Sequence, residues 1–369
     1  RSRIITWSLA VFSGMTAVCG LAANFWHLLL ARIGVGVGEA GTNPASHSLI
    51  ADLYPLSRRS TAMAIFALGP HIGLFLGFLV GGWLNQWYGW RVAFLAAGMP
   101  GLLLAGVVHL TLKEPPRGLA DGGSPMAIKP PRLGDVCREM WGRPSLRHIL
   151  AGGALASFVA YGIISWLPAH LARSHQMESG TIGVVLALVV GLGGGVGTFL
   201  GGRLADHLGR SKASWQVRLV ALALILGAPL WIAVFLAPDT TAMLWLLVLP
   251  GMLLGVFVGP TYALVQALVD PGGRAVAAAI LLFIGNLIGL GLGPLVIGVL
   301  SDLLRSQSGG DSLRLALLLA SPVSLWAAYH YARAGQTLGR DLARGREPQA
   351  PETPAPMAPV ATSPRGGIG

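Results

Sequence analysis

The sequence predicts an all-α membrane protein, and three observations support this prediction. Of its 369 residues, 53% are hydrophobic and only 11% are charged, and the mean hydropathy is +0.65. A soluble domain carries roughly 25% charged residues, so this chain has too few charges to cover a water-exposed surface. The apolar residues form long runs separated by short basic loops. We therefore expect most of the chain to lie in helices that cross a bilayer.

Ten runs are long enough to span a membrane, because a spanning helix needs about 20 mainly apolar residues. The third, eighth and ninth are rich in Gly and Pro, which membrane helices tolerate better than soluble ones. The predicted spans, in order, are residues 4–22, 27–50, 60–84, 91–112, 148–171, 180–202, 216–236, 242–268, 275–301 and 313–333.

The net charge of +11 is distributed over the loops in a way that predicts orientation rather than nucleic-acid binding. Of the 26 basic residues, Arg32 lies inside a span, and Arg91, Arg173, Arg305 and Arg314 fall on one side. The remaining 21 fall on the other side, which we take as cytoplasmic. We expect a multi-pass protein of the cell inner (plasma) membrane with both termini of this chain in the cytoplasm.

A segment rich in Pro, Gly and Arg separates the first four spans from the last six. This composition predicts an N-terminal helical bundle at 1–112, a cytoplasmic linker at 113–147 and a C-terminal six-helix bundle at 148–333. The last residues, 334–369, become polar and then rich in Pro and Ala, so we expect a disordered cytoplasmic tail.

An internal repeat relates the two bundles. Residues 58–84 match 274–300 at eight positions, four of which are glycine pairs. The match places the third span over the ninth, so the repeating unit is six helices. We therefore expect a twelve-helix parent whose first two helices are missing from this N-terminally truncated chain, and we expect the chain alone to be unstable or inactive. Two six-helix halves related by an axis along the membrane normal are typical of transporters.

Three segments of the sequence resemble the major facilitator superfamily. The loop GGRLADHLGR (201–210) resembles that family's cytoplasmic signature, ARIGVGVGEAG (31–41) resembles its fourth helix, and GWRVAF (89–94) resembles the entry to its sixth. The resemblance implies the major facilitator fold, with ten of its twelve transmembrane helices present in two pseudo-symmetric bundles.

A closer resemblance is to the spinster-like branch of that family. It rests on GEAGTNPASHSLIADLYPLSRRSTAMAIFALG (38–69), WLPAHLARSH (166–175) and GLGLGPLVIGVLSD (289–302). The similarity covers nearly all of residues 1–333.

The family resemblance implies a conformational role for the loop after the sixth span. Arg203, Asp206, Gly209 and Arg210 would form a cytoplasmic gating motif that holds this face by ion pairing or helix capping. Arg203 alternatively contributes only positive-inside charge.

The spans contain one acidic residue, Glu39, and one basic residue, Arg32. Placing a charged side chain inside the membrane costs at least about 2.5–3.5 kcal/mol of free energy, so we expect each of these two residues to have a function. Seven residues are nearly two helical turns, which puts both side chains on one face, about 10 Å apart. One interpretation is a structural ion pair with a neighbouring helix. The resemblance to spinster-like transporters implies instead that both belong to a proton-coupling and substrate site.

Other polar side chains within the spans are expected to line a central cavity, although each is equally suited to hydrogen-bond a neighbouring helix. The repeated glycines of the third and ninth spans are expected to allow close helix packing. The cavity-lining candidates are Asn43, His71, Tyr161, Tyr262, Gln266 and Asn286.

No motif for a cofactor or a metal is found in the sequence. Gly36, Gly38 and Gly41 satisfy G-x-G-x-x-G, but they lie in an apolar span rather than after a strand. Neither a G-x-x-x-x-G-K-[ST] nor an H-E-x-x-H sequence occurs. His47 and Ser48 come nearest to a catalytic pair, yet adjacent helical residues point in different directions. We therefore expect no cofactor, no metal site, no catalytic residues and no enzymatic activity.

We interpret the chain as a proton-coupled secondary active transporter that works by alternating access. The spinster resemblance implies an amphiphilic or lipid-like substrate, such as a lysophospholipid or a sphingoid compound. Small organic anions or drugs, as in other branches, and a receptor or sensor that binds without net flux remain open alternatives. The expected partners are the substrate, protons and membrane lipid, and the expected state is a monomer.

Overall fold

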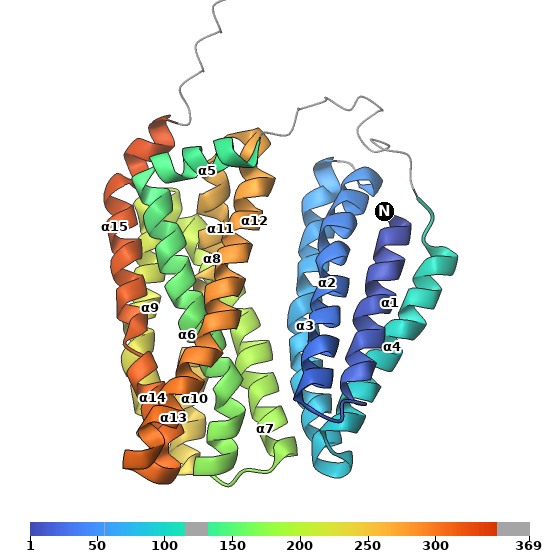
Figure 1. The fold of residues 1–369 in the computed structure, drawn as a ribbon. Coiled ribbons are helices and arrows are strands. Elements are labelled where there is room, and N and C mark those ends of the chain that lie inside the picture. Colours follow the sequence, from blue (N-terminus) through green and yellow to red (C-terminus); the bar gives the residue numbers. More distant parts are fainter. Residues whose placement is uncertain (55, 115–131, 345–369) are drawn as a thin grey trace, which may run out of the picture.

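The computed structural model describes residues 1–54, 56–114 and 132–344, and its helices stand side by side in two units (Figure 1). Every regular element in these ranges is helical, which confirms the all-α prediction. Eight of the described helices are long and apolar enough to cross a membrane. We call the end of the molecule that carries α5 (Leu133–Gly142) the linker end, and the opposite end, with the loop between α6 and α7, the hairpin end.

The N-terminal unit consists of four long helices that follow one another up and down the molecule (Figure 1). The side chain of Asn24 caps α2 by accepting a hydrogen bond from the backbone N–H of His27 at 2.9 Å. The tight turn between α3 and α4 is made by Gly89, whose φ of 82° is unfavourable for any other residue. The helices are α1 (Ser2–Cys19), α2 (Phe25–Leu53), α3 (Leu56–Tyr88) and α4 (Trp90–Thr111).

The C-terminal unit contains six rods of helix, several of which are interrupted by a π-helical turn or a short break. Together with the four helices of the N-terminal unit they correspond one by one to the ten predicted spans. The rods are α6 (Pro144–Ser174); α7 (Ser179–Leu186), η2 (Ala187–Gly193) and α8 (Gly194–Gly209); α9 (Ser214–Phe235); α10 (Thr240–Val256) and α11 (Val258–Ala267); η3 (Pro271–Gly273), α12 (Arg274–Ile284), η4 (Gly285–Leu292) and α13 (Gly293–Ser308); η5 (Gly309–Asp311), α14 (Ser312–Ala320) and α15 (Val323–Arg344).

The last helix continues beyond the predicted end of its span. We expected a disordered tail from 334 onward, but α15 is helical through Arg344. One face explains the extension, because Ala334, Leu338 and Asp341 are all at least 98% buried and follow helical spacing. Residues 345–369 of the expected tail, and 115–131 of the linker, lie outside the described residues.

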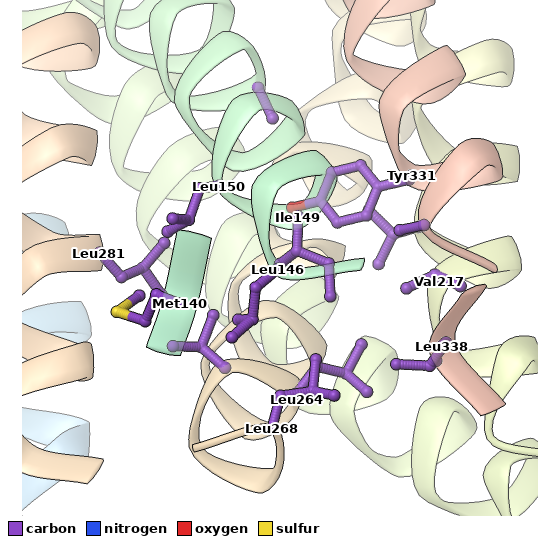
Figure 2. Packing of buried hydrophobic residues seen from close by; sticks show 14 of the residues in the cluster. Met140, Leu146, Ile149, Leu150, Val217, Leu264, Leu268, Leu281, Tyr331 and Leu338 are labelled. Carbon is purple, nitrogen blue, oxygen red and sulfur yellow. The ribbon is translucent and has the colours of Figure 1, made fainter. Parts of the chain in front are cut away.

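The amphipathic helix α5 belongs to the sequence segment between the units and is fastened to the C-terminal unit. Its buried side chains, Val136 and Met140, join a hydrophobic cluster with Leu146, Leu264 and Leu281 (Figure 2). The Arg143 side chain, just after α5, pairs with Glu139 at 2.8 Å and donates to the backbone carbonyl of Leu268. The linker region thus ends in a helix packed against α6 and α12 at the linker end (Figure 1).

The two units contact each other mainly through α3 on one side and α7 with η2 on the other. Hydrogen bonds between the described residues of the two units lie at the hairpin end, where Asn85 Nδ2 donates to Ser179 Oγ at 2.8 Å. Gln86 donates to Glu178 at 2.7 Å and accepts from the backbone N–H of Gly180 at 2.7 Å. These contacts hold the hairpin end closed.

Candidate functional site

A cavity of about 280 Å³ lies between the units and gathers four of the six predicted polar candidates. His71 reaches it from α3, Tyr161 from α6, Tyr262 from α11 and Asn286 from η4. His71 also approaches the other unit closely, because a Cβ added to Gly195 would lie 3.2 Å from its ring. The cavity is therefore built from both units.

Three small hydroxyl side chains also line the cavity and were missed by the sequence analysis: Ser157, Thr198 and Thr261. Thr198 donates to the carbonyl of Gly194 in its own helix at 2.9 Å. The hydroxyl of Thr261 lies 2.6 Å from that of the buried Tyr331. Ser and Thr are common in membrane helices because they can bond their own backbone, so the sequence carries no signal that singles these three out.

The rest of the cavity wall is apolar. A binding site with few polar groups in an apolar wall suits a ligand with a polar head and an apolar body. The larger apolar side chains of this wall are Leu74, Ile164, Val190, Leu254, Phe257, Val258, Leu281 and Leu282.

Arg32 and Glu39 both lie on the exposed part of α2, and no ion pair joins them in the described part of the chain. Glu39 is close enough to Tyr161 of α6, in the C-terminal unit, for the two side chains to interact electrostatically. A different face of α2 packs on α1, where a Cβ added to Gly38 would lie 2.5 Å from the backbone nitrogen of Phe12. The G-x-G-x-x-G glycines thus include a helix-packing position.

Two of the six predicted cavity residues are not found with the other four in the cavity lining. Gln266 is exposed in the last turn of α11, where its backbone carbonyl accepts from Arg274 Nε at 3.1 Å. It does not line the cavity and lies about one turn beyond Tyr262, close to the end of α11 at Ala267. The side chain of Asn43 lies outside the described residues, so its predicted role stays a prediction.

The predicted gating motif lies at the linker end of α8. Arg203, Asp206 and Arg210 are exposed and line a hollow beside that helix, and none of them forms an ion pair among the residues that the structure describes. Gly209 lies close to α9, since a Cβ there would lie 2.6 Å from the end of the flexible Gln216 side chain. The predicted gating role of these residues therefore stays a prediction.

Other charged residues form the ion pairs at the linker end, and the sequence analysis missed them. Arg1 pairs with Asp52 and, at 2.8 Å, with Glu114 in the N-terminal unit. In the C-terminal unit Arg143 pairs with Glu139 and lies 4.0 Å from Asp270. The available signal was their position at the ends of apolar runs, where charges meet water.

The chain is similar to known membrane transport proteins. Residues 1–294 match the family model of the Major Facilitator Superfamily. An MFS-type efflux pump of Mycolicibacterium smegmatis is 30% identical over 343 residues, which are 92% of this chain and 78% of that protein. Protein spinster homolog 1 of Homo sapiens is 27% identical over 321 residues, 82% of this chain and 60% of the relative.

A solved structure shares the fold over most of the chain. It is a bacterial homolog to the human lysosomal transporter spinster, in an inward-facing and unoccupied conformation. The TM-score is 0.81 at 30% identity, and the alignment covers 92% of this chain and 84% of that one.

Proposed function

This chain belongs to the spinster-like branch of the major facilitator superfamily of membrane transporters, and from that premise we propose that it moves an amphiphilic solute by alternating access. The observation that carries this proposal is the cavity between the units, which has a mainly apolar wall and a few polar groups. A lysophospholipid or a sphingoid compound has the matching combination of a polar head and an apolar chain.

The closed hairpin end supports a rocking mechanism. In the present conformation α3 contacts α7 and η2 near that end, while the cavity lies deeper between the units. Transport requires the hairpin end to open and the linker end to close around the same cavity. The hydrogen bonds of Asn85 and Gln86 would break in that transition and re-form in its reversal.

We propose that Glu39 couples this movement to protons, and that Arg32 provides the positive charge that acts on its carboxylate. Both sit on the exposed part of α2, and Glu39 acts electrostatically on Tyr161 of the other unit. Enclosing a carboxylate between the units removes it from water and favours the protonated form. Loss of the proton would then oppose closure, so proton binding and the conformational change are linked.

We propose that the protein lies in the inner (plasma) membrane of the cell. The linker end would then face the cytoplasm. The excess of arginine and lysine in the loops at that end supports this orientation. The site is assembled from one chain, so we propose that a monomer is the working unit.

Flux into liposomes tests the substrate class. Purified protein is reconstituted, a pH gradient is imposed, and uptake of a labelled lysophospholipid is compared with that of a labelled organic dicarboxylate. The proposal predicts uptake of the lysophospholipid that disappears when the gradient is collapsed. Uptake of the dicarboxylate alone would discard the amphiphilic substrate and favour a small-anion transporter, in which Arg32 would act as the substrate's counter-charge.

A further inference from the structure

Four basic side chains gather on the C-terminal unit where α6 and α15 run side by side. His148 Nδ1 lies 3.0 Å from His330 Nδ1, and the two ring centroids are 5.2 Å apart. The charges of Arg147 and Arg333 both act on His148. We call Arg147, His148, His330 and Arg333 the basic cluster.

No acidic side chain among the described residues neutralises the positive charge of the basic cluster. The side chains that act electrostatically on His148 are His330, Arg333 and Arg147, all of which are basic. Neither arginine forms an ion pair within the described ranges, and α6 contains no acidic residue. Asp341, the one acidic residue of α15, is 2% exposed and accepts two hydrogen bonds from Ser145.

The basic cluster sits where the apolar part of each helix begins. No Asp, Glu, Lys or Arg occurs between Arg147 and Arg173 in α6, or between Arg314 and Arg333 in α14 and α15. Such a boundary marks the level of the lipid headgroups.

Aromatic side chains support this placement. Trp326 and Tyr329 are 58% and 55% exposed, and their ring centroids lie 6.1 Å and 5.5 Å from that of His330. Exposed Trp and Tyr are typical of the interfacial belt of a membrane protein, where their apolar rings lie beside acyl chains.

We propose that the basic cluster binds the phosphate group of an anionic phospholipid of the surrounding bilayer. Two guanidinium groups and the imidazole N–H groups supply donors for the phosphate oxygens, and the charge that the protein leaves unbalanced supplies the attraction. The acyl chains then lie along the apolar surface beside Trp326. This position is on the lipid-facing surface of α6 and α15, apart from the cavity that receives the transported solute.

Native mass spectrometry of the full chain in neutral detergent tests the proposal. Phosphatidylglycerol or phosphatidylcholine is added at increasing concentration, and the lipid retained by each protein molecule is counted. Wild type is expected to retain the anionic lipid preferentially. Removing both positive charges in Arg147→Gln/Arg333→Gln should weaken that retention by roughly thirtyfold, whereas Arg147→Lys/Arg333→Lys should restore most of it.

The matched control removes two exposed arginines near the hairpin end of the same unit, in Arg173→Gln/Arg305→Gln, and should change retention less than twofold. Equal melting temperatures without added lipid establish that the variants are folded.

A second readout avoids detergent. In nanodiscs, brominated phosphatidylglycerol should quench more tryptophan fluorescence in wild type than in Trp326→Phe. Equal retention by the Arg147/Arg333 and control variants would overturn the proposal. Full competition by inorganic phosphate at equal concentration would instead assign the basic cluster to a soluble anion.

Discussion

Gly82 of α3 and Gly183 of α7 meet backbone to backbone at the hairpin end, where a Cβ added to Gly82 would lie 2.7 Å from the Cα of Gly183. The neighbouring Asn85 and Gln86 make hydrogen bonds between the units in the same region. Close approach of two glycines in membrane helices allows extensive van der Waals contact between backbones. This contact therefore helps to set whether the hairpin end is closed or open.

Replacing Gly82 by Val should separate the units at this end. The added side chain meets the backbone of α7, which cannot move aside as a flexible side chain would. Cysteines at Asn85 and Ser179, in a Cys137→Ser background, report closure by cross-linking. We expect Gly82→Val to lower the cross-linking yield at least about fivefold, which corresponds to roughly 1 kcal/mol in the equilibrium between the closed and open states.

Gly81→Val provides the control for that experiment. Gly81 is the preceding residue of the same helix, and a Cβ there has no neighbour within 4 Å among the described atoms. Its cross-linking yield should match that of the double-cysteine protein in which Gly81 and Gly82 are both intact. An equal loss in both variants would mean that valine perturbs α3 itself rather than the contact with Gly183.

Asp341 should contribute to stability through the start of α6. Its carboxylate accepts hydrogen bonds from the Ser145 backbone N–H at 2.9 Å and from the Ser145 hydroxyl at 2.6 Å. Asp341→Ala leaves these buried donors without a partner and should lower the free energy of unfolding in mixed micelles by about 2–3 kcal/mol. Arg340→Ala, at the exposed neighbouring position, should change it by no more than about 0.5 kcal/mol. Similar losses in both variants would show that Asp341 has no special role.

His175 should make stability depend on pH. Burial, and then the charge of Arg314, lower the pKa of His175, whose hydroxyl partner Thr240 lies 3.1 Å away. Just below the ordinary value of 6.5 the unfolded chain is already protonated while the folded protein is not. Unfolding takes up a proton in that range, so the free energy of unfolding should fall as the pH drops below about 6.5.

The melting temperature of His175→Asn tests this assignment between pH 7.5 and 5.5. The variant should lose less stability than wild type over that interval, because it has no imidazole to protonate. A parallel pH dependence in both proteins would contradict the contribution of His175.

Tyr161 should affect the recognition of substrate. Tyr161 lines the cavity and interacts electrostatically with Glu39 of the other unit. Tyr161→Phe keeps the shape of the wall but removes one polar group, so KM for the amphiphile should rise roughly threefold to tenfold. Tyr329→Phe, on the exposed surface of α15, should leave KM unchanged. An unaltered KM in Tyr161→Phe would remove that residue from the recognition site.

The sequence predicted the ten helical rods because each depends on local composition alone, and a run of about 20 apolar residues is a strong signal. Eight of the described helices are long and apolar enough to cross a membrane. Local composition is a weaker signal at the ends of helices. Residues 334–344 are polar enough to suggest a tail, yet Ala334, Leu338 and Asp341 bury one face of α15. The hydrogen-bond partner of Asp341 is Ser145, which is 196 residues away in the sequence, so no local sequence pattern predicts this contact.

The cavity was only partly predictable for a similar reason. Tyr262 and Gln266 are one turn apart, and spacing alone assigns both to the same face. How far the cavity extends along α11 decides that Tyr262 lines it and Gln266 does not, and this depends on how the neighbouring helices pack. Tyr161 was identifiable as a polar side chain in an apolar span, but its position opposite Glu39 depends on how the two units sit together.

The most direct test of the account compares wild type with Glu39→Gln in liposomes, measuring uptake of labelled lysophospholipid in two modes. Gradient-driven uptake requires proton coupling, whereas exchange of substrate between equal pools requires only alternating access. The account predicts that Glu39→Gln loses uptake driven by the pH gradient but keeps exchange. Full gradient-driven uptake in Glu39→Gln would contradict the coupling role of Glu39, and loss of both modes would place the residue in substrate binding rather than in coupling.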